Sequence, residues 1–105
     1  MEITFEKEYL QDLYEKGKTT DKKYRFQPQI VKKYCKTIDV LESVACIEDL
    51  YRYKALQYEM LKGDKKGISS VRVNDQYRIE FTTKQVVSEI VVTICNIIEL
   101  SNHYK

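Results

Sequence analysis

The stretch LKGDKKGISSVRVNDQYRIEF, residues 61–81, contains the clearest strand–turn–strand pattern in the chain. Apolar residues alternate with polar ones on both sides of a polar break, namely Val71 and Val73 before it and Tyr77, Ile79 and Phe81 after it. A period of two on both sides of a break predicts a β-hairpin with one apolar face. Residues 74–76 supply the turn, because short polar side chains tolerate its dihedral angles.

The same pattern predicts the register of this hairpin. The apolar residues that flank the turn must share a face, so the loop is odd in length and centred near Asp75. Arg72 then lies opposite Arg78 on the polar face, away from the helices, with the Arg78 side chain exposed. Like charges in this position are destabilising, whereas a phosphate between them would make an anion site. Alternatively, Glu80, diagonal to Arg72, neutralises the pair as an ordinary solvated cluster.

Length and composition indicate one compact domain, residues 1–105, with a modest core, since 43% of the residues are hydrophobic. The net charge is only +2, which excludes a strongly basic field over the whole protein. Positive charge is local instead, in the hairpin region and in a second cluster at Lys18, Lys22, Lys23, Arg25, Lys32, Lys33 and Lys36. The lysines of this second cluster are most simply a solvated helix face, with an RNA-facing patch as the alternative.

Cysteine usage and hydropathy predict a cytoplasmic protein. The amino terminus is acidic and lacks the apolar run of a signal peptide, and no apolar stretch is long enough to cross a bilayer. Cys35, Cys46 and Cys95 are odd in number, have no CxxC spacing and lie in apolar neighbourhoods. We therefore expect buried thiols in a reducing compartment, with neither a disulfide framework nor a zinc site.

The remaining chain predicts an α+β fold. A short strand around Ile3 and Phe5 precedes a helix that begins near Lys7 and ends at Gly17, and Pro28 opens a second, longer helix. Residues 44–53 are ambiguous, residues 53–60 suggest a strand, and a long strand is expected over residues 89–100, after residues 82–88. In this strand the even positions are apolar and the odd positions are mixed, as expected of a central strand that is covered on both faces over part of its length. The expected architecture is an antiparallel twisted sheet with the two N-terminal helices packed on one face.

Several motifs carry a resemblance to a known family. They are LYEKG at residues 13–17, the helix opened by Pro28, IEDL at residues 47–50, LKGDKKG at residues 61–67 and VRVNDQYRIEF at residues 71–81. In order and spacing the chain resembles the HigB-type toxins of the RelE/ParE superfamily over nearly its whole length. The resemblance implies a RelE-like, microbial-RNase-type fold and a toxin of a type II toxin–antitoxin module. It also implies a HigA-like antitoxin that carries a helix-turn-helix.

The activity implied by the resemblance is cleavage of mRNA in the ribosomal A site, which arrests translation and growth. Such cleavage needs a base for the ribose 2′-OH, cations for the pentacoordinate phosphorane and an acid for the leaving 5′-oxygen, with no metal or other cofactor. The resemblance places Lys62 of the LKG motif and Arg78 of the YR strand at the site. It also matches His103 to the closing histidine of the family, and histidine is the side-chain type that can exchange protons at physiological pH.

The chain departs from the family at other positions. Ser101 and Asn102 stand where many relatives have Asp and Tyr, and Glu59 stands where one branch has a second histidine. Glu59 is either a general base with a raised pKa or an exposed strand residue. Tyr104 is a candidate to replace the missing tyrosine by stacking on a base. The candidate catalytic set is therefore Arg78, His103, Lys62, Glu59 and Asn102, and the candidate RNA contacts are Arg72, Lys65, Lys66 and Tyr104.

Two other classes of function stay open. A toxin of the same fold that poisons gyrase, like the ParE branch, would not need His103 or Lys62. An inactive module that only binds an antitoxin would fit the modest net charge.

Overall fold

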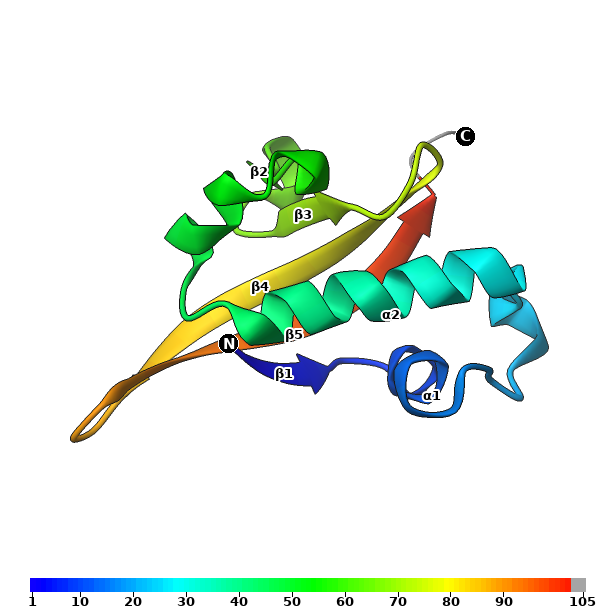
Figure 1. Cartoon of the computed structure of the whole chain (residues 1–105), viewed down its shortest axis with the longest axis horizontal. Coiled ribbons are helices and arrows are strands. Elements are labelled where there is room, and N and C mark those ends of the chain that lie inside the picture. The colour runs from blue at the N-terminus through cyan, green and yellow to red at the C-terminus, as the bar shows by residue number, and fades with distance from the viewer. Residues whose placement is uncertain (103–105) are drawn as a thin grey trace.

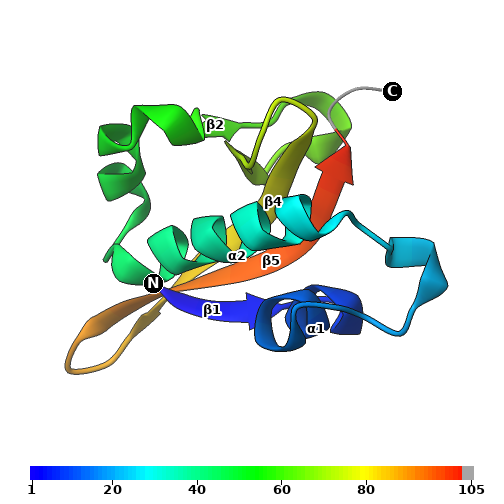
Figure 2. The same cartoon turned by 45° about the vertical axis from the view of Figure 1, so that its right-hand side comes forward.

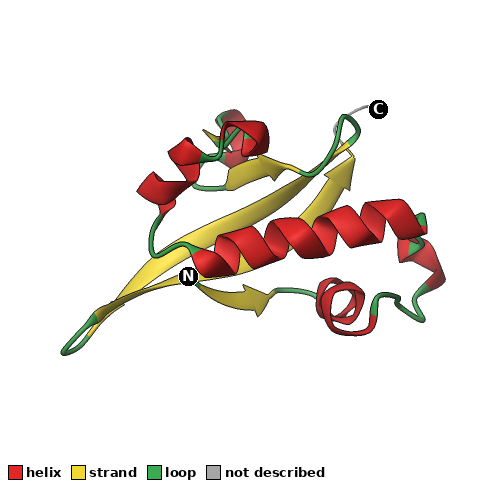
Figure 3. Ribbon diagram, in the orientation of Figure 1, coloured by secondary structure: helices red, strands yellow, loops and turns green. Residues whose placement is uncertain are grey.

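The computed structural model describes residues 1–102 as a five-stranded sheet with two α-helices on one face (Figures 1 and 3). The elements are β1 (Glu2–Phe5), α1 (Glu8–Lys16), α2 (Pro28–Ser43), β2 (Glu59–Met60), β3 (Ser69–Arg72), β4 (Tyr77–Val87) and β5 (Val91–Asn102). Short 3₁₀-helices lie at Lys22–Tyr24, Ile47–Arg52, Lys54–Leu56 and Gly63–Lys65. The α+β class expected from the sequence is confirmed.

α1 lies between the predicted ends, and α2 begins at the predicted residue. α1 ends at Gly17, whose φ of 75° is readily adopted only by glycine and whose amide donates to the Leu13 carbonyl at 3.2 Å. α2 begins with Pro28 in its first turn. Its buried stripe packs on the sheet and on α1, where the Tyr34 hydroxyl donates to the Leu10 carbonyl at 2.7 Å. The two α-helices therefore lie on one face of the sheet, and neither of them covers the other face (Figure 2).

The strand order is β1-β5-β4-β3-β2, and only the pairing of β1 with β5 is parallel. The sheet is therefore mixed, which corrects the prediction of an antiparallel sheet in this detail. After β1 the chain forms both helices and then β2, β3 and β4. The last strand, β5, lies between β4 and β1. β5 then runs in the same direction as β1.

The β3–β4 hairpin is confirmed with the predicted odd loop. Arg72 is the direct cross-strand partner of Arg78, and the Val73 amide donates to the Tyr77 carbonyl at 3.0 Å. The Asn74 carboxamide oxygen closes the turn by accepting from the amides of Gln76 and Tyr77 at 2.9 and 2.7 Å.

The β4–β5 hairpin corrects the prediction for residues 82–100. β4 continues to Val87, so residues 82–87 are strand, and β5 begins only at Val91. The ladder pairs Phe81 with Ile97 but Glu80 with Glu99, so one extra residue in β5 forms a β-bulge. The bulge shifts the buried positions of β5 from odd to even numbers, so Cys95 and Ile97 are buried before it and Leu100 is buried after it.

The stretch before β2 is also different from the prediction. Residues 53–60 contain the 3₁₀-helix Lys54–Leu56 and only the two-residue strand β2, where a longer strand was expected. Leu50 of the preceding 3₁₀-helix and Leu56 are both buried in the core, so residues 47–56 pack on the core as short turns of helix. Gln57 then takes a left-handed conformation with φ of 45°, and the chain enters β2.

Candidate functional site

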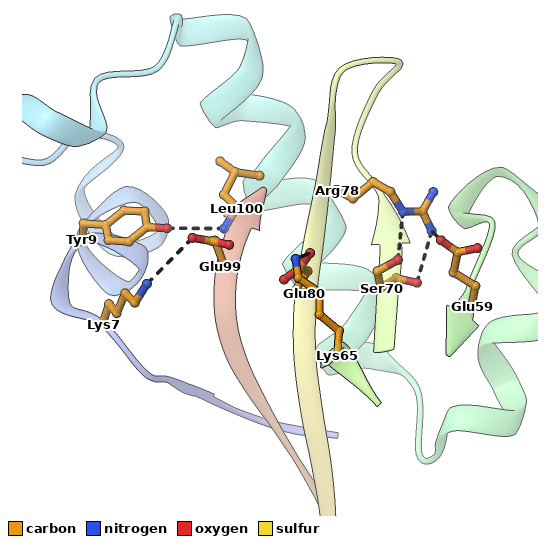
Figure 4. A network of polar contacts seen from close by, with 9 residues as sticks. All are labelled: Lys7, Tyr9, Glu59, Lys65, Ser70, Arg78, Glu80, Glu99 and Leu100. Atoms are coloured by element: carbon orange, nitrogen blue, oxygen red, sulfur yellow. Dashed lines mark hydrogen bonds and ion pairs between the residues drawn. The ribbon is translucent and has the colours of Figure 1, made fainter. Parts of the chain in front are cut away.

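The sheet face opposite the helices carries two adjacent rows of polar side chains. Residues directly opposite one another in a ladder share a face, and so do residues two apart along a strand. One row contains Arg72, Arg78 and Ser101, and the next contains Glu59, Ser70, Glu80 and Glu99. Between these positions, apolar residues of the same strands point into the core. The rows therefore bring β2, β3, β4 and β5 together at one polar surface (Figure 4).

Arg78 lies at the centre of this surface and is held by its neighbours. Its Nε donates to the Ser70 hydroxyl at 2.8 Å, and its Nη2 donates to the carbonyls of Gln57 at 2.6 Å and Ser70 at 3.3 Å. Only 9% of the residue is exposed, so the expectation of an exposed Arg78 side chain is wrong. Burial lowers the pKa of the guanidinium, while the charge of Glu59 opposes this shift. An arginine nevertheless stays protonated at physiological pH.

Glu59 provides the carboxylate that lies beside Arg78. Its Oε1 is 3.8 Å from Arg78 Nη2, and just over half of its side chain is exposed. Glu59 is therefore an exposed strand residue, the second of the two alternatives considered for it, and it borders the arginine. An exposed carboxylate at this distance is free to rotate toward a bound ligand.

Lys65 and Arg72 each have an acidic partner, and the partner of Arg72 is not the Glu80 that one alternative expected. Glu80 accepts from Lys65 Nζ at 2.8 Å, so its carboxylate is committed to that lysine and does not neutralise the arginine pair. The same hydrogen bond raises the pKa of Lys65. Arg72 instead forms an ion pair with Asp75 of its own turn. Each arginine of the cross-strand pair therefore has its own acidic neighbour.

Arg72 also joins the hairpin to the lysines of α2. It lines a shallow hollow of about 210 Å³ together with Lys33 and Lys36, and apolar residues form the floor. The two clusters of positive charge that are separate in the sequence thus meet at this rim. Periodicity within either segment could not have shown that meeting.

The other candidates lie around this surface or beyond the described residues. Lys62 and Lys66 are exposed and have no polar side-chain partner within residues 1–102. Ser101 is the cross-strand partner of Arg78, and Asn102 pairs with Tyr77 at the end of β5. His103 and Tyr104, which follow directly in the chain, lie outside the described residues.

The described part of the chain holds no cluster of three or more His, Cys, Asp or Glu side chains suited to a metal ion. Its three cysteines are free thiols. Cys95 is buried, as expected, while Cys35 and Cys46 are only partly buried.

Sequence reasoning missed Ser70 and Gln57, the two residues that hold Arg78. Ser70 has a usable signal, because the predicted register places it diagonally from Arg78 on the same face. Gln57 has none, because its contact is made by a backbone carbonyl in an unusual conformation.

The fold of this chain is similar to those of several solved bacterial toxins. A YoeB/ParE toxin from Agrobacterium tumefaciens superimposes with a TM-score of 0.54 at 23% identity, covering 99% of this chain and 100% of that one. A YoeB dimer from Staphylococcus aureus gives a TM-score of 0.50 at 25% identity, covering 99% and 98%. A heterotetrameric YoeB–YefM toxin–antitoxin complex from the same species gives 0.51, with the same identity and coverage. The fold is thus that of the YoeB/RelE-like toxins.

Sequence comparison identifies the family within that class. The family model described as "RelE-like toxin of type II toxin-antitoxin system HigB" matches residues 3–94. Toxin HigB-1 of Vibrio cholerae serotype O1 (strain ATCC 39315 / El Tor Inaba N16961) is 30% identical over 82 residues, which are 77% of this chain and 82% of that protein. The chain belongs to the HigB family of RelE-like toxins of type II toxin–antitoxin systems, as its motifs predicted. Within residues 1–102, none of the helices has the length and apolar character needed to span a membrane.

Proposed function

We propose that this toxin is a ribosome-dependent endoribonuclease that cleaves translated mRNA through attack by the ribose 2′-OH, without a metal. One observation carries the proposal. A carboxylate from β2 and a guanidinium from β4 lie 3.8 Å apart on the sheet face away from the helices, with Ser101 beside them. These are the two charges that such a cleavage needs at the scissile phosphate.

In the proposed reaction Glu59 is the general base. It takes the proton from the 2′-OH of the nucleotide on the 5′ side of the scissile bond, and O2′ then bonds to phosphorus. Arg78 stabilises the negative charge that develops on the phosphorane oxygens. The bond from phosphorus to O5′ breaks, and His103 donates a proton to the leaving oxygen. The products are a 2′,3′-cyclic phosphate and a 5′-hydroxyl.

The chain order supports the assignment of His103 as the acid. β5 brings Ser101 opposite Arg78, and His103 follows two residues later. Two residues of extended chain reach about 7 Å, which is within the dimensions of one nucleotide. Asn102 lies between them at the same end of the sheet.

The basic residues around the site are proposed to bind RNA. Lys62 and Lys66 are exposed on the loop that follows β2, and Arg72 shares its hollow with Lys33 and Lys36. Lys65 contributes positive charge although Glu80 binds it, and Tyr104 is proposed to stack on a base. The contacts of the lysines and of Arg72 would be with the phosphate backbone, and such contacts carry little sequence information.

We also propose that the toxin acts on mRNA in the ribosomal A site and that a HigA-like helix-turn-helix antitoxin inhibits it. Membership of a toxin–antitoxin family supports an antitoxin partner. The Staphylococcus aureus YoeB–YefM complex gives a precedent for such pairing in a toxin of this fold.

Primer extension on a translated mRNA, with and without ribosomes, tests the activity. We expect new 3′ ends only when ribosomes and the toxin are both present. Arg78→Ala should lower the rate about a hundredfold or more, and Glu59→Gln by about 10²–10⁴-fold. His103→Ala should lose less than Arg78→Ala. Glu42→Gln, which changes an exposed charge elsewhere, should cleave at the parent rate.

Two outcomes would contradict the assignment. Parent-rate cleavage by both Arg78→Ala and Glu59→Gln would remove these residues from the mechanism. Intact mRNA together with toxin-dependent inhibition of gyrase would favour the ParE-like alternative.

A further inference from the structure

The contacts of Arg78 divide its guanidinium into a fixed part and an open part. Nε and Nη2 donate to Ser70 and to the Gln57 carbonyl, at 2.6–3.3 Å. Nη1 has no hydrogen-bond partner within residues 1–102, and it is not a buried unsatisfied atom. One guanidinium nitrogen points away from both Ser70 and Glu59 (Figure 4). The open nitrogen is therefore presented in a direction that its neighbours determine.

The acceptors that fix Arg78 are mostly neutral. A hydroxyl and two carbonyls take its N–H groups at hydrogen-bond distance, while the Glu59 carboxylate is farther away, at 3.8 Å. Neutral acceptors orient a guanidinium without cancelling its charge, unlike a close bidentate carboxylate. Because Arg78 is also shielded from water, its remaining charge acts more strongly on a bound anion.

Gln57 contributes through its backbone conformation. It is the one non-glycine residue with positive φ in the described chain, at 45°, and it ends the 3₁₀-helix Lys54–Leu56. This conformation is disfavoured for residues with a side chain and is kept where surrounding contacts determine it. Here its carbonyl accepts from Arg78 at 2.6 Å, the shortest of the contacts to that side chain.

We propose that Ser70 and Gln57 are positioning residues, which hold Arg78 so that its Nη1 faces the scissile phosphate. This inference rests on the proposed nuclease function, in which Arg78 stabilises the transition state. A guanidinium with free Nε and Nη2 would sample several rotamers, and a catalytic group that loses its orientation loses rate. Ser70 and Gln57 act through Arg78 and need no contact with RNA.

Ser70→Ala is the direct variant, and Ser69→Ala is its matched control. Ser69 is the neighbouring buried serine of β3, and its hydroxyl bonds to Tyr58 at 2.9 Å. In single-turnover cleavage of ribosome-bound mRNA, Ser70→Ala should lower the maximal rate about tenfold. The ribosome concentration at half-maximal rate should change less than twofold. Ser70→Thr, which restores a hydroxyl, should recover most of the lost rate, and Ser69→Ala should keep the parent rate.

The double variant Ser70→Ala/Arg78→Ala shows whether Ser70 acts through Arg78. It should cleave as slowly as Arg78→Ala alone, because there is no guanidinium left to orient. A further tenfold loss would mean that Ser70 acts independently and would overturn the inference.

Arginine side-chain NMR gives a readout that does not depend on activity. Hydrogen exchange of the Arg78 Nε–H should be faster in Ser70→Ala than in the parent and unchanged in Ser69→Ala. If Arg78→Ala is inactive while Ser70→Ala keeps both parent rate and parent exchange, the positioning role is wrong and the nuclease proposal stands. If Arg78→Ala itself cleaves at the parent rate, the proposed function of Arg78 fails instead.

Discussion

Arg78 has a structural role as well as its proposed chemical one, because its guanidinium joins β4 to β3 and to the turn before β2. Arg78→Ala removes these hydrogen bonds, so it should lower the free energy of unfolding by about 2–3 kcal/mol. Urea denaturation followed by circular dichroism measures this change. Arg25→Ala, at an exposed loop position, should stay within about 0.5 kcal/mol of the parent. Equal stability of the two variants would show that the contacts of Arg78 contribute nothing to folding.

Cys95 makes the stability of the protein sensitive to alkaline pH. Burial in the core raises the pKa of its thiol from an ordinary 9.0 to about 12. Above pH 9 the unfolded chain loses this proton while the folded chain keeps it, so the stability contribution is complete below pH 9 and falls as pH rises toward 12. Between pH 8 and pH 10 this one group should cost about 1.4 kcal/mol.

The contribution of Cys95 is isolated by comparison with Cys95→Val, which has no ionisable thiol but a similar volume. Urea unfolding at both pH values should show a smaller loss for the variant, by about 1.4 kcal/mol. Other alkaline effects, such as ionisation of the buried Tyr9, whose pKa burial raises to about 12, occur in both proteins and cancel. Parallel losses in the two proteins would contradict the prediction.

At the scale of elements, the two ends of the β4–β5 hairpin differ in what they contribute. Ile97 is fully buried in the core, whereas Val87 is 70% exposed near the turn, where the hairpin projects beyond its neighbours (Figure 1). Ile97→Ala should therefore destabilise the protein by about 2–5 kcal/mol, and Val87→Thr by less than about 0.5 kcal/mol. Thermal or urea unfolding compares them. A large loss at Val87 would mean that the projecting end is packed against something in solution.

The elements that local pattern predicted well are those that local interactions form. The β3–β4 hairpin, its odd loop, the Gly17 end of α1 and the Pro28 start of α2 all follow from a few neighbouring residues. The faces of β5 did not follow, because the bulge opposite Glu80 and Phe81 depends on the partner strand. Residues 53–60 were misassigned because burial of Leu56 against the sheet outweighed a weak strand pattern.

At the scale of the whole molecule, the candidate site depends on strand order, which periodicity does not specify. The register within one hairpin correctly placed Arg72 opposite Arg78. The meeting of Glu59 with Arg78 requires β2 to pair with the far side of β3, and only the family resemblance pointed to it. The parallel β1–β5 pair was missed for the same reason, since both strands lie at opposite ends of the sequence.

In the proposed mechanism an RNA 2′-OH is the attacking group, and Glu59 and Arg78 serve its attack. The most direct measurement uses two ribosome-bound mRNAs that differ only in a single 2′-deoxy nucleotide on the 5′ side of the mapped cleavage bond. We predict that the all-ribose mRNA is cut to a 2′,3′-cyclic phosphate and a 5′-hydroxyl, and that the 2′-deoxy mRNA is not cut at that bond. Cleavage of the 2′-deoxy mRNA at the same rate, or products that end in a 3′-hydroxyl and a 5′-phosphate, would contradict the mechanism.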